Sequence, residues 1–282
     1  MLEIADLCKK YKGFELAHLS FRLPKGFIMG LVGKNGAGKS TTIKSIMNMI
    51  DFQGEILIDG CDNVACEKQM KQKIGIVVDQ PFFPTLFTLR QVGKYAGAFY
   101  ENWDGDTYDK LLRRFGMLPD KKVSELSRGM GVKLQLAAAL SHQARLLVLD
   151  EPTSGLDPVA RDELMDILME YIQDGSNSVL FSTHISADLE KIADYITILS
   201  DGKLFYTGEK DALMEKYIIV KGDYKNVSKQ LKKELIGIRR YGDGFEAMIA
   251  RDRYLFYDED LFQSEDAKID DILIYAERSA AS

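Results

Sequence analysis

The sequence is poor in cysteine and proline and has no long apolar run. Its 282 residues include three cysteines, six prolines and one tryptophan. The cysteines are odd in number and show no C-x-x-C spacing, which favours free thiols in a reducing compartment and argues against a zinc site. No apolar stretch approaches the roughly 18 residues that span a bilayer, and the acidic N-terminus lacks the charge pattern of a signal peptide. We therefore expect any membrane-spanning part of its system to belong to another chain.

Basic charge is also scarce relative to acidic charge. The chain carries 43 Asp and Glu against 37 Lys and Arg, which gives a formal net charge of −6. Such a chain has no overall attraction for the phosphate backbone of nucleic acids, so we expect no nucleic-acid partner. Hydrophobic residues make up 46% of the chain, which is enough for the core of one large or two modest domains.

The first half of the chain is patterned as strands and then as helices. Short apolar blocks separated by glycine turns predict an antiparallel β-meander in residues 1–32. The last block, residues 27–32, is apolar on both faces, as is typical of a buried parallel strand. From about residue 80 to 145 the apolar spacing is helical.

A βαβ unit follows. Apolar strands at 146–149 and 179–181 flank a helical pattern over 159–172, and this order predicts parallel strands in one sheet. After Gly208 the elements become short and mixed, which predicts a small α+β unit. In this tail we expect a helix to about residue 216, a strand at 217–220, a helix at 227–235, short strands near 236–239 and 245–250, and a terminal helix from Ala267.

The strongest local signal is a glycine-rich segment, G-x-x-x-x-G-K-[ST], directly after the buried strand at 27–32. Its glycines let backbone N–H groups face one anion at the start of a helix, which makes the segment a phosphate cradle. Lys39 would reach the β- and γ-phosphates, and the Ser40 hydroxyl would bind Mg²⁺. The predicted nucleotide-binding residues are Gly33, Asn35, Gly36, Ala37, Gly38, Lys39, Ser40 and Thr41.

Two carboxylates end the strand at 146–149. The carboxyl ends of parallel strands open onto one crevice, so Asp150 is expected beside the phosphate cradle as a magnesium ligand. Glu151 is placed to accept a hydrogen bond from an attacking water, which makes it a catalytic residue. A solvated acidic strand end is the alternative interpretation of this pair.

With these segments the sequence resembles the nucleotide-binding subunit of ATP-binding cassette (ABC) transporters, and further motifs follow in that family's order. Gln80 matches the Q-loop glutamine, which implies contact with Mg²⁺ and the attacking water. Ser127 and Gly129 match the signature peptide, whose hydroxyl and amide the resemblance places on the γ-phosphate of the opposite subunit. The sequence departs from the family pattern at Arg128, where Gly is frequent, and at Met130, where Gln is usual.

Three further residues take their roles from the resemblance. Asp157 matches the D-loop that crosses the dimer interface, and His184 matches the switch histidine beside the γ-phosphate. Tyr11 matches the aromatic residue that stacks on adenine, for which only an exposed ring face is needed. A surface tyrosine on an edge strand is the alternative for Tyr11.

The resemblance implies an α/β fold. It consists of a P-loop NTPase core with a mainly parallel sheet, an antiparallel β-meander at the N-terminus, a helical subdomain at about 85–145 and a small C-terminal α+β appendage. We place an ABC ATPase domain at residues 1–212 and a small domain without an assigned role at 213–282.

The implied function is that of a transport ATPase that converts ATP and water to ADP and phosphate, with ATP and Mg²⁺ as cofactors. A second cassette, identical to this one or different, would close on the nucleotide. A separate transmembrane permease would carry the cargo, and the direction of transport would be export. The chain would lie in the cytoplasm on the inner face of the cell membrane, held there by its permease. The aromatic stretch 81–87 would contact that permease, or alternatively would anchor the helical subdomain.

Two other functions are considered. One is a soluble ABC ATPase with a regulatory or nucleic-acid or ribosome-related role. DNA-repair relatives insert a very long coiled coil between phosphate loop and signature, whereas residues 41–126 are too few and lack sustained heptads. Translation-type relatives carry two cassettes, and this chain has one. The second alternative function is regulatory: the C-terminal tail would sense a ligand or restrain the ATPase.

Overall fold

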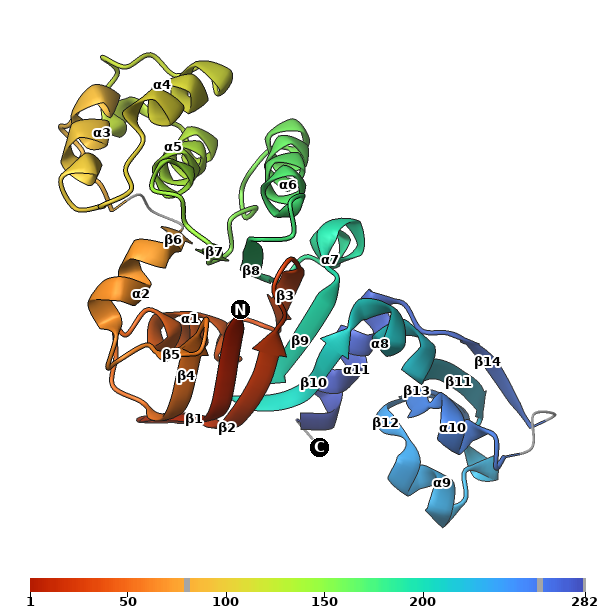
Figure 1. Ribbon diagram of the computed structural model, residues 1–282. Coiled ribbons are helices and arrows are strands. Elements are labelled where there is room, and N and C mark those ends of the chain that lie inside the picture. The colour runs from red at the N-terminus through yellow and green to blue at the C-terminus, as the bar shows by residue number, and fades with distance from the viewer. Residues whose placement is uncertain (79–81, 258–260, 281–282) are drawn as a thin grey trace.

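The computed structural model describes residues 1–78, 82–257 and 261–280 (Figure 1). Within these ranges none of the helices combines the length and the hydrophobicity that crossing a membrane requires. The α/β fold that the sequence predicts is confirmed, with a parallel core, an antiparallel N-terminal sheet, a group of helices and a C-terminal α+β part.

An antiparallel sheet forms the N-terminal face. Its strand order is β2-β1-β4-β5. The strands are β1 (Leu2–Tyr11), β2 (Phe14–Leu23), β4 (Gln53–Ile58) and β5 (Cys61–Asp62). The pairing of β1 with β2 confirms the start of the predicted meander, and it shifts register on both sides of the pair Leu7 and Leu19.

The central sheet has the strand order β10-β9-β3-β8-β7-β6. Its strands are β3 (Ile28–Val32), β6 (Ile74–Val77), β7 (Leu146–Leu149), β8 (Ser178–Thr183), β9 (Tyr195–Ser200) and β10 (Lys203–Glu209). All neighbours are parallel except the edge pair β9 and β10. Every residue of β3, β7 and β8 is buried, which explains why these strands are apolar on both faces. The hairpin of β9 and β10 was not predicted.

Two hydrophobic clusters cover the two faces of this sheet. One lies between the sheets and joins Leu7 and Leu19 to Met29 and Leu180. The other lies under the helices on the opposite face and includes Phe181. The helices that connect the strands are α1 (Lys39–Ile46), α2 (Glu67–Lys73), α6 (Pro158–Ile172) and α7 (Ser186–Ile192).

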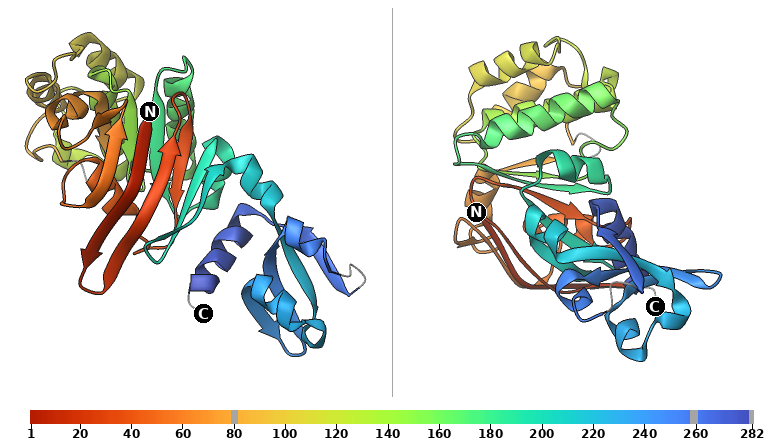
Figure 2. Two further views of the ribbon diagram at one scale, coloured as in Figure 1. Left: turned by 60° about the horizontal axis from the view of Figure 1, so that its bottom comes forward. Right: turned by 90° about the vertical axis from the view of Figure 1, so that its right-hand side faces the viewer.

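The helical subdomain projects from one end of the central sheet (Figures 1 and 2). It consists of α3 (Leu89–Gly97), α4 (Gly105–Arg114), the 3-10 turn η1 (Val123–Glu125) and α5 (Arg128–Ser141). Thr88, Asp104 and Ser127 cap the three α-helices through side-chain oxygens that accept backbone N–H bonds. Its own hydrophobic cluster gathers around Leu89, Leu112 and Leu134, and it confirms the helical pattern of this region.

The C-terminal part contains a four-stranded antiparallel sheet of order β12-β13-β11-β14. Its elements are α8 (Lys210–Lys216), β11 (Tyr217–Asp223), η2 (Tyr224–Asn226), α9 (Lys229–Glu234), β12 (Ile236–Tyr241), β13 (Gly244–Ala250), α10 (Arg251–Tyr254), β14 (Phe262–Asp266) and α11 (Ile269–Ala280). The helices and strands expected in the tail are confirmed, whereas α10 and β14 were not predicted.

The last helix returns to the central sheet. Figure 2 shows α11 between that sheet and the small C-terminal sheet. Ile269, Ile272 and Tyr275 of α11 share a hydrophobic cluster with Ile196 and Ile198 of β9. The C-terminal part therefore buries apolar surface against the parallel core as well as within its own sheet.

Candidate nucleotide-binding and active site

The glycine-rich loop joins the end of β3 to the start of α1. A Cβ atom at Gly33 would come within 2.3 Å of the Leu199 carbonyl oxygen. Gly38 has φ +113°, and a Cβ there would lie 2.8 Å from Leu16 Cδ1. Only glycine fits both positions without displacing its surroundings. The loop therefore brings its backbone close to its neighbours and leaves the first N–H groups of α1 facing outward, as an anion site requires.

Lys39 is held inside this loop. Its side chain is 5% exposed, and Nζ donates to the carbonyl oxygens of Gly33, at 2.7 Å, and Lys34, at 3.3 Å. A groove of about 580 Å³ opens beside it. The groove is lined by Gly13, Phe14, Lys34, Asn35, Gly36, Gly38, Lys39, Ser40, Thr41, Glu151 and Asp201.

Most of the predicted nucleotide-binding residues therefore line one groove. The exceptions in the loop are Gly33 and Ala37, which are buried beneath it. The Ala37 N–H donates to the Lys34 carbonyl oxygen at 3.1 Å and so shapes the turn.

Glu151 bridges the lysine and the histidine. Its Oε1 lies 3.2 Å from Lys39 Nζ, and its Oε2 lies 2.7 Å from His184 Nδ1. Glu151 has φ +50°, a left-handed conformation that is uncommon for a residue other than glycine. Such backbone strain concentrates at functional sites. Two residues that follow different strands, β7 and β8, thus converge with the phosphate loop.

Asp150 and Glu151 are positioned through Ser182, a residue that sequence reasoning did not assign to the site. The Ser182 hydroxyl donates to Asp150 Oδ1 at 2.6 Å and accepts the Glu151 backbone N–H at 2.9 Å. Because β7 and β8 are parallel neighbours, their carboxyl ends meet at this point. The sequence feature that could have identified Ser182 is its position, since it is a hydroxyl residue two positions before His184.

The oxygen donors near the groove suit a magnesium ion. Ser40 exposes its hydroxyl at the start of α1, and Asp150 supplies a carboxylate at the end of β7. Hydroxyl, carboxylate, water and phosphate oxygens are the ligands that Mg²⁺ prefers. Gln80, the third predicted magnesium ligand, lies outside the described residues.

A buried acid supports the segments on either side of His184. Asp188, 1% exposed, accepts hydrogen bonds from Thr153 Oγ1 at 2.6 Å and Thr183 Oγ1 at 3.1 Å. Arg161 Nε lies 2.5 Å from its other oxygen. These bonds join the segment after Glu151 to the end of β8. Sequence reasoning missed Asp188, because Thr153 and Arg161, 35 and 27 positions away, become its neighbours only in the fold.

The signature residues lie at the start of α5. Ser127 is exposed, and its Oγ accepts the Met130 N–H at 3.3 Å as the helix N-cap. A Cβ at Gly129 would lie 3.4 Å from Leu156 Cδ2, and one at Gly155 would lie 2.7 Å from Arg128 Nη1. The signature and the D-loop segment therefore touch within one chain, away from the residues that line the phosphate groove.

Asp157 and Met130 have local partners. Asp157 is exposed and caps α6, because its Oδ1 accepts the N–H groups of Val159 and Ala160 at 3.0 Å each. Met130 is half-buried against the helical subdomain, where Lys121 Nζ lies 3.8 Å from its sulfur.

An aromatic pair lies at one end of the groove. Tyr11 ends β1 with 42% of its surface exposed, and its ring stacks on that of Phe14 with centroids 6.5 Å apart. Phe14 lines the groove and was not assigned to the site from the sequence. The pair offers an exposed ring face of the kind on which a base stacks.

Gln135 ties the signature helix to the segment before Gln80. Its side chain is buried, Nε2 donates to the Val78 carbonyl oxygen at 2.9 Å, and Oε1 accepts the Val78 N–H at 3.1 Å. Sequence reasoning missed this residue, because a glutamine within an apolar helix gives no indication of a partner 57 positions away.

The family model described as ABC transporter matches residues 16–154. Among curated proteins, the chain is 31% identical over 220 residues to the ABC transporter ATP-binding protein YtrB of Bacillus subtilis (strain 168), covering 77% of this chain and 75% of that protein. It is 32% identical over 212 residues to the bacitracin transport ATP-binding protein BcrA of Bacillus licheniformis, covering 72% and 68%. It is 34% identical over 224 residues to the Nod factor export ATP-binding protein I of Rhizobium leguminosarum bv. viciae, covering 77% and 72%.

Solved structures have the same fold. An ATP-binding subunit of an ABC transporter superposes with a TM-score of 0.69 at 28% identity, over 76% of this chain and 91% of that one. The dimeric ATP-binding cassette MJ0796, bound to ADP and Pi, superposes with a TM-score of 0.67 over 74% and 98%, and at 21% identity it supports the fold alone.

Proposed function

Because this chain belongs to the family of ABC transporter ATP-binding subunits, we propose that ATP hydrolysis in the groove beside Lys39 powers export through a separate transmembrane permease. The chain is an ABC ATPase that binds ATP. Relatives named for bacitracin transport and Nod factor export support the direction of transport. The observation that carries the proposal is the convergence of Lys39, Glu151 and His184 at the mouth of the phosphate loop.

In this proposal the ammonium of Lys39 leaves the Glu151 carboxylate and binds the phosphates of ATP. Its ammonium is paired with Glu151 Oε1 and two loop carbonyl oxygens. The β- and γ-phosphates of ATP would take the place of the Glu151 oxygen, with the N–H groups at the start of α1 as further donors. Glu151 would then be released toward the attacking water. Adenine would stack on the pair formed by Tyr11 and Phe14.

Magnesium would be held by Ser40, Asp150 and Gln80. When bound, Mg²⁺ neutralises charge on the β- and γ-phosphates. The Ser182 hydroxyl orients Asp150 through the bond to Oδ1. Hydroxyl, amide and carboxylate oxygens are ligands that suit Mg²⁺, which supports this set.

Glu151 would act as the base for hydrolysis. The water oxygen forms a bond to the γ-phosphorus, the bond from that phosphorus to the β-γ bridging oxygen breaks, and Glu151 accepts the proton that the water loses. His184, 2.7 Å from Glu151 Oε2, would orient this carboxylate and would lie beside the γ-phosphate. ADP and inorganic phosphate are the products.

The second half of each site would come from another cassette. Ser127, Gly129 and Asp157 lie apart from the phosphate groove of their own chain and are at least partly exposed. Two chains in opposite orientation would place the signature of one over the γ-phosphate of the other. We propose that the functional unit is such a dimer, formed with an identical or a different cassette.

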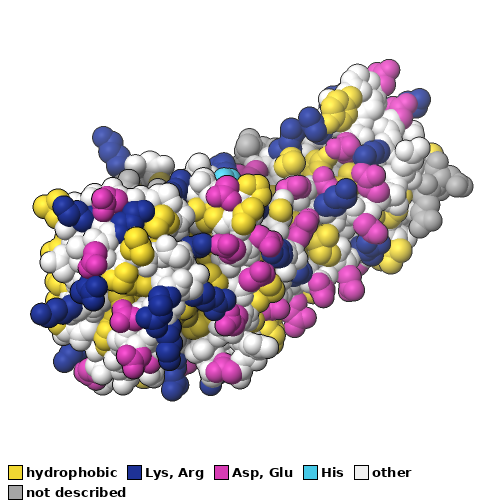
Figure 3. Space-filling model, turned by 90° about the horizontal axis from the view of Figure 1, so that it is seen from above, with side chains coloured by type: hydrophobic (Ala, Val, Ile, Leu, Met, Phe, Trp, Pro, Cys, Tyr) yellow, Lys and Arg dark blue, Asp and Glu magenta, His cyan; other side chains and the backbone are white. Residues whose placement is uncertain are grey.

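An aromatic groove between α2 and the helical subdomain is the proposed contact with the permease. Figure 3 is a view onto the side of the molecule that carries the helical subdomain, where hydrophobic side chains are exposed among Lys, Arg, Asp and Glu side chains. Phe82 and Phe99 are 56% and 60% exposed, whereas Phe83 is buried. The groove, of about 460 Å³, is lined by Lys68, Lys71, Gln72, Phe82, Phe83, Tyr95, Ala96, Phe99 and Tyr100. An exposed aromatic patch of this kind marks an interaction site. Through this contact the chain would reside on the cytoplasmic face of the cell membrane.

The proposed ATPase domain spans residues 1–212, and residues 213–282 form the proposed C-terminal domain. Glu277 of α11 lies 2.9 Å from Lys34 in the phosphate loop. This contact supports a restraining role for the C-terminal domain. A soluble ABC ATPase that acts on nucleic acids or ribosomes is not favoured, because the named relatives are transport subunits.

The proposal is tested by the mass of the Glu151→Gln variant in size-exclusion chromatography with and without Mg-ATP, together with steady-state ATP hydrolysis by the wild type. We expect hydrolysis by the wild type and an ATP-dependent shift of the variant from monomer to dimer. Absence of ATP binding and of hydrolysis would contradict the proposed site. ATP binding without a mass shift would contradict a homodimer and direct the search toward a different cassette.

A further inference from the structure

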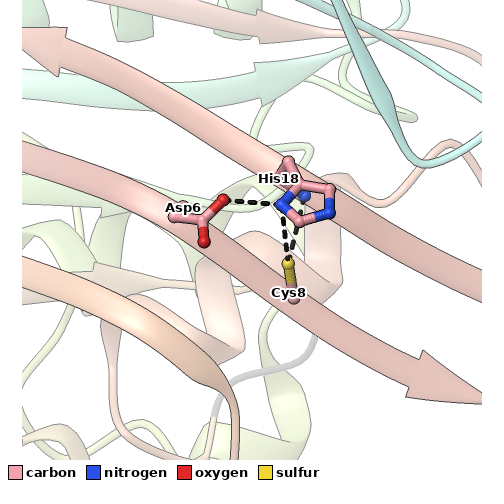
Figure 4. A group of neighbouring side chains, drawn as sticks. All are labelled: Asp6, Cys8 and His18. Carbon is pink, nitrogen blue, oxygen red and sulfur yellow. Dashed lines mark hydrogen bonds and ion pairs between the residues drawn. The ribbon is translucent and has the colours of Figure 1, made fainter.

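Three metal-ligating side chains converge on the N-terminal sheet, and none of them lines the phosphate groove. Asp6 and Cys8 come from β1, and His18 comes from β2 (Figure 4). His18 Nδ1 lies 2.6 Å from Asp6 Oδ1 and 3.7 Å from Cys8 Sγ. One ligand atom from each residue lies within 4.8 Å of the others. Among the described residues, no other group of three or more His, Cys, Asp and Glu side chains has its ligand atoms this close together.

Two irregularities in the strand pairing bring these side chains together. Leu7 pairs with Leu19, and both are buried in the core between the sheets. The register shifts on either side of this pair, and the bulged residues Asp6 and His18 have φ of +53° and +52°. A bulge re-aims the side chain of the extra residue. As a result Asp6, Cys8 and His18 meet on the face of the hairpin that is turned away from the core.

The arrangement differs from a catalytic triad. In a triad the histidine uses one ring nitrogen for the nucleophile and the other for the acid. Here Asp6 Oδ1 and Cys8 Sγ both approach the same nitrogen, Nδ1. Cys8 Sγ also accepts the His18 backbone N–H at 3.2 Å. A ring nitrogen, a sulfur and a carboxylate oxygen within 4.8 Å of one another are a donor set that suits a metal ion.

The distance between the sulfur and the ring nitrogen fits a small tetrahedral ion. With metal-ligand bonds of about 2.3 Å to sulfur and about 2.0 Å to nitrogen, ligand atoms at tetrahedral angles lie about 3.5 Å apart. The distance of 3.7 Å between Cys8 Sγ and His18 Nδ1 matches this edge. Asp6 Oδ1 is at hydrogen-bond distance, so a metal would replace the shared proton and move this carboxylate outward by less than about 1 Å.

We propose that Asp6, Cys8 and His18 form a binding site for a divalent transition-metal ion, Zn²⁺ by preference, with water as the fourth ligand. A thiolate and an imidazole select Zn²⁺ over Mg²⁺ and Ca²⁺. The thiolate and the carboxylate together balance the charge of the ion. Because Asp6 and His18 are exposed, solvent reaches the open position. The bound ion would link β1 to β2 at the two points where their register shifts.

Cobalt titration of the nucleotide-free chain under reducing conditions tests the site without recourse to ATPase activity. We expect one equivalent of Co²⁺ to produce a thiolate-to-cobalt charge-transfer band and the visible bands of tetrahedral Co²⁺. One equivalent of Zn²⁺ should abolish both. Zn²⁺ affinity is then measured by competition with a chromophoric chelator.

Four single variants show whether the metal binds at Cys8 and His18 or at one of the other cysteines. Cys8→Ser should remove the charge-transfer band, and both Cys8→Ser and His18→Asn should weaken Zn²⁺ binding at least tenfold. Asn tolerates the left-handed backbone at position 18, so the hairpin is retained. Cys61→Ser and Cys66→Ser are the matched controls and should bind like the wild type, since both are free thiols outside the group. Absence of the band in the wild type, its survival in Cys8→Ser, or its loss in either control would overturn the proposal.

Discussion

The Lys39 ammonium lies 3.2 Å from Glu151 Oε1, so the predicted phosphate-binding cation and the predicted catalytic base are paired with each other. The other carboxylate oxygen of Glu151 lies 2.7 Å from His184 Nδ1. Binding of a triphosphate at Lys39 competes with this pair. A substitution that removes the charge of Glu151 is therefore expected to slow hydrolysis without weakening nucleotide binding.

Glu151→Gln should lower the steady-state rate of ATP hydrolysis by about 10²- to 10⁴-fold, the usual contribution of a general base. ATP affinity should stay equal or become tighter, because the variant removes a negative charge beside the phosphate site. Phosphate release and equilibrium nucleotide binding measure the two effects. Glu163→Gln is the matched control, since Glu163 is a half-exposed acid that pairs with Lys133 on the surface. If both variants lost the same activity, the role of Glu151 would have to be reassigned.

Glu277→Gln should tighten ATP binding by about two- to fivefold at low salt, the size typical of exposed charge pairs. Lys34 pairs with Asp201 and Glu277, and these contacts raise the pKa of its amino group above the usual range. Removing the charge of Glu277 reduces the negative potential at the entrance to the phosphate loop. The effect should shrink as ionic strength rises.

Asp270→Asn is the control for this change, because Asp270 is an exposed acid on the same helix, about 10 Å along the axis from Glu277. If both variants changed ATP affinity equally, the effect would come from the overall charge of the chain and not from the contact of Glu277 with the phosphate loop. Weaker ATP binding by Glu277→Gln would show that α11 supports the loop instead of restraining it.

Ser127→Arg should abolish hydrolysis while leaving the ATP affinity of the isolated chain nearly unchanged. The exposed position would place a large cation where the opposite phosphate loop must close. Ser127→Asn keeps a side-chain acceptor for the Met130 N–H and should preserve the helix cap. Hydrolysis rates and nucleotide titrations of both variants are the measurement. A large loss of ATP affinity in the Arg variant would argue against a composite site.

Phe99→Glu should reduce association of the chain with membranes that contain its permease, and it should leave ATP binding intact. Phe99 lines the aromatic groove with 60% of its surface exposed. Leu118→Glu is the matched control, because Leu118 is 73% exposed outside that groove. Membrane pelleting of tagged variants from the native cells compares them. Equal pelleting of both variants with the wild type would place the permease contact elsewhere.

Lowering the pH from 7.5 to 5.5 should destabilise the wild type more than a His142→Gln variant. His142 is 2% exposed, and burial lowers the pKa of its imidazole below the usual value of 6.5. Below pH 6.5 the unfolded chain binds a proton that the folded chain still excludes, so stability falls with falling pH. A single group contributes at most about 1.4 kcal/mol per pH unit. Urea unfolding at several pH values measures the difference, and parallel curves for the two proteins would refute it.

The phosphate loop and the order of elements around it were predictable because their causes are local. Gly38 with φ +113° and the buried strand before it leave a recognisable pattern in consecutive residues. The position of Asp150 was predictable for a more general reason, since the carboxyl ends of neighbouring parallel strands meet. The hairpin of β9 and β10 was missed although the sequence carries a signal for it, since Asp201-Gly202 is a typical two-residue hairpin turn between the strands.

By itself the sequence determined the phosphate loop, the strand that precedes it and the carboxylates at the end of β7, because each depends on adjacent residues and on backbone conformations that few residue types adopt. The tertiary structure alone decided which distant side chains meet. It brought Ser182 to Asp150 and Glu277 to Lys34. Such contacts depend on strand register and on the return of α11 to the central sheet. Both are set by burial of apolar surface between elements far apart in the chain, which spacing along the sequence does not record.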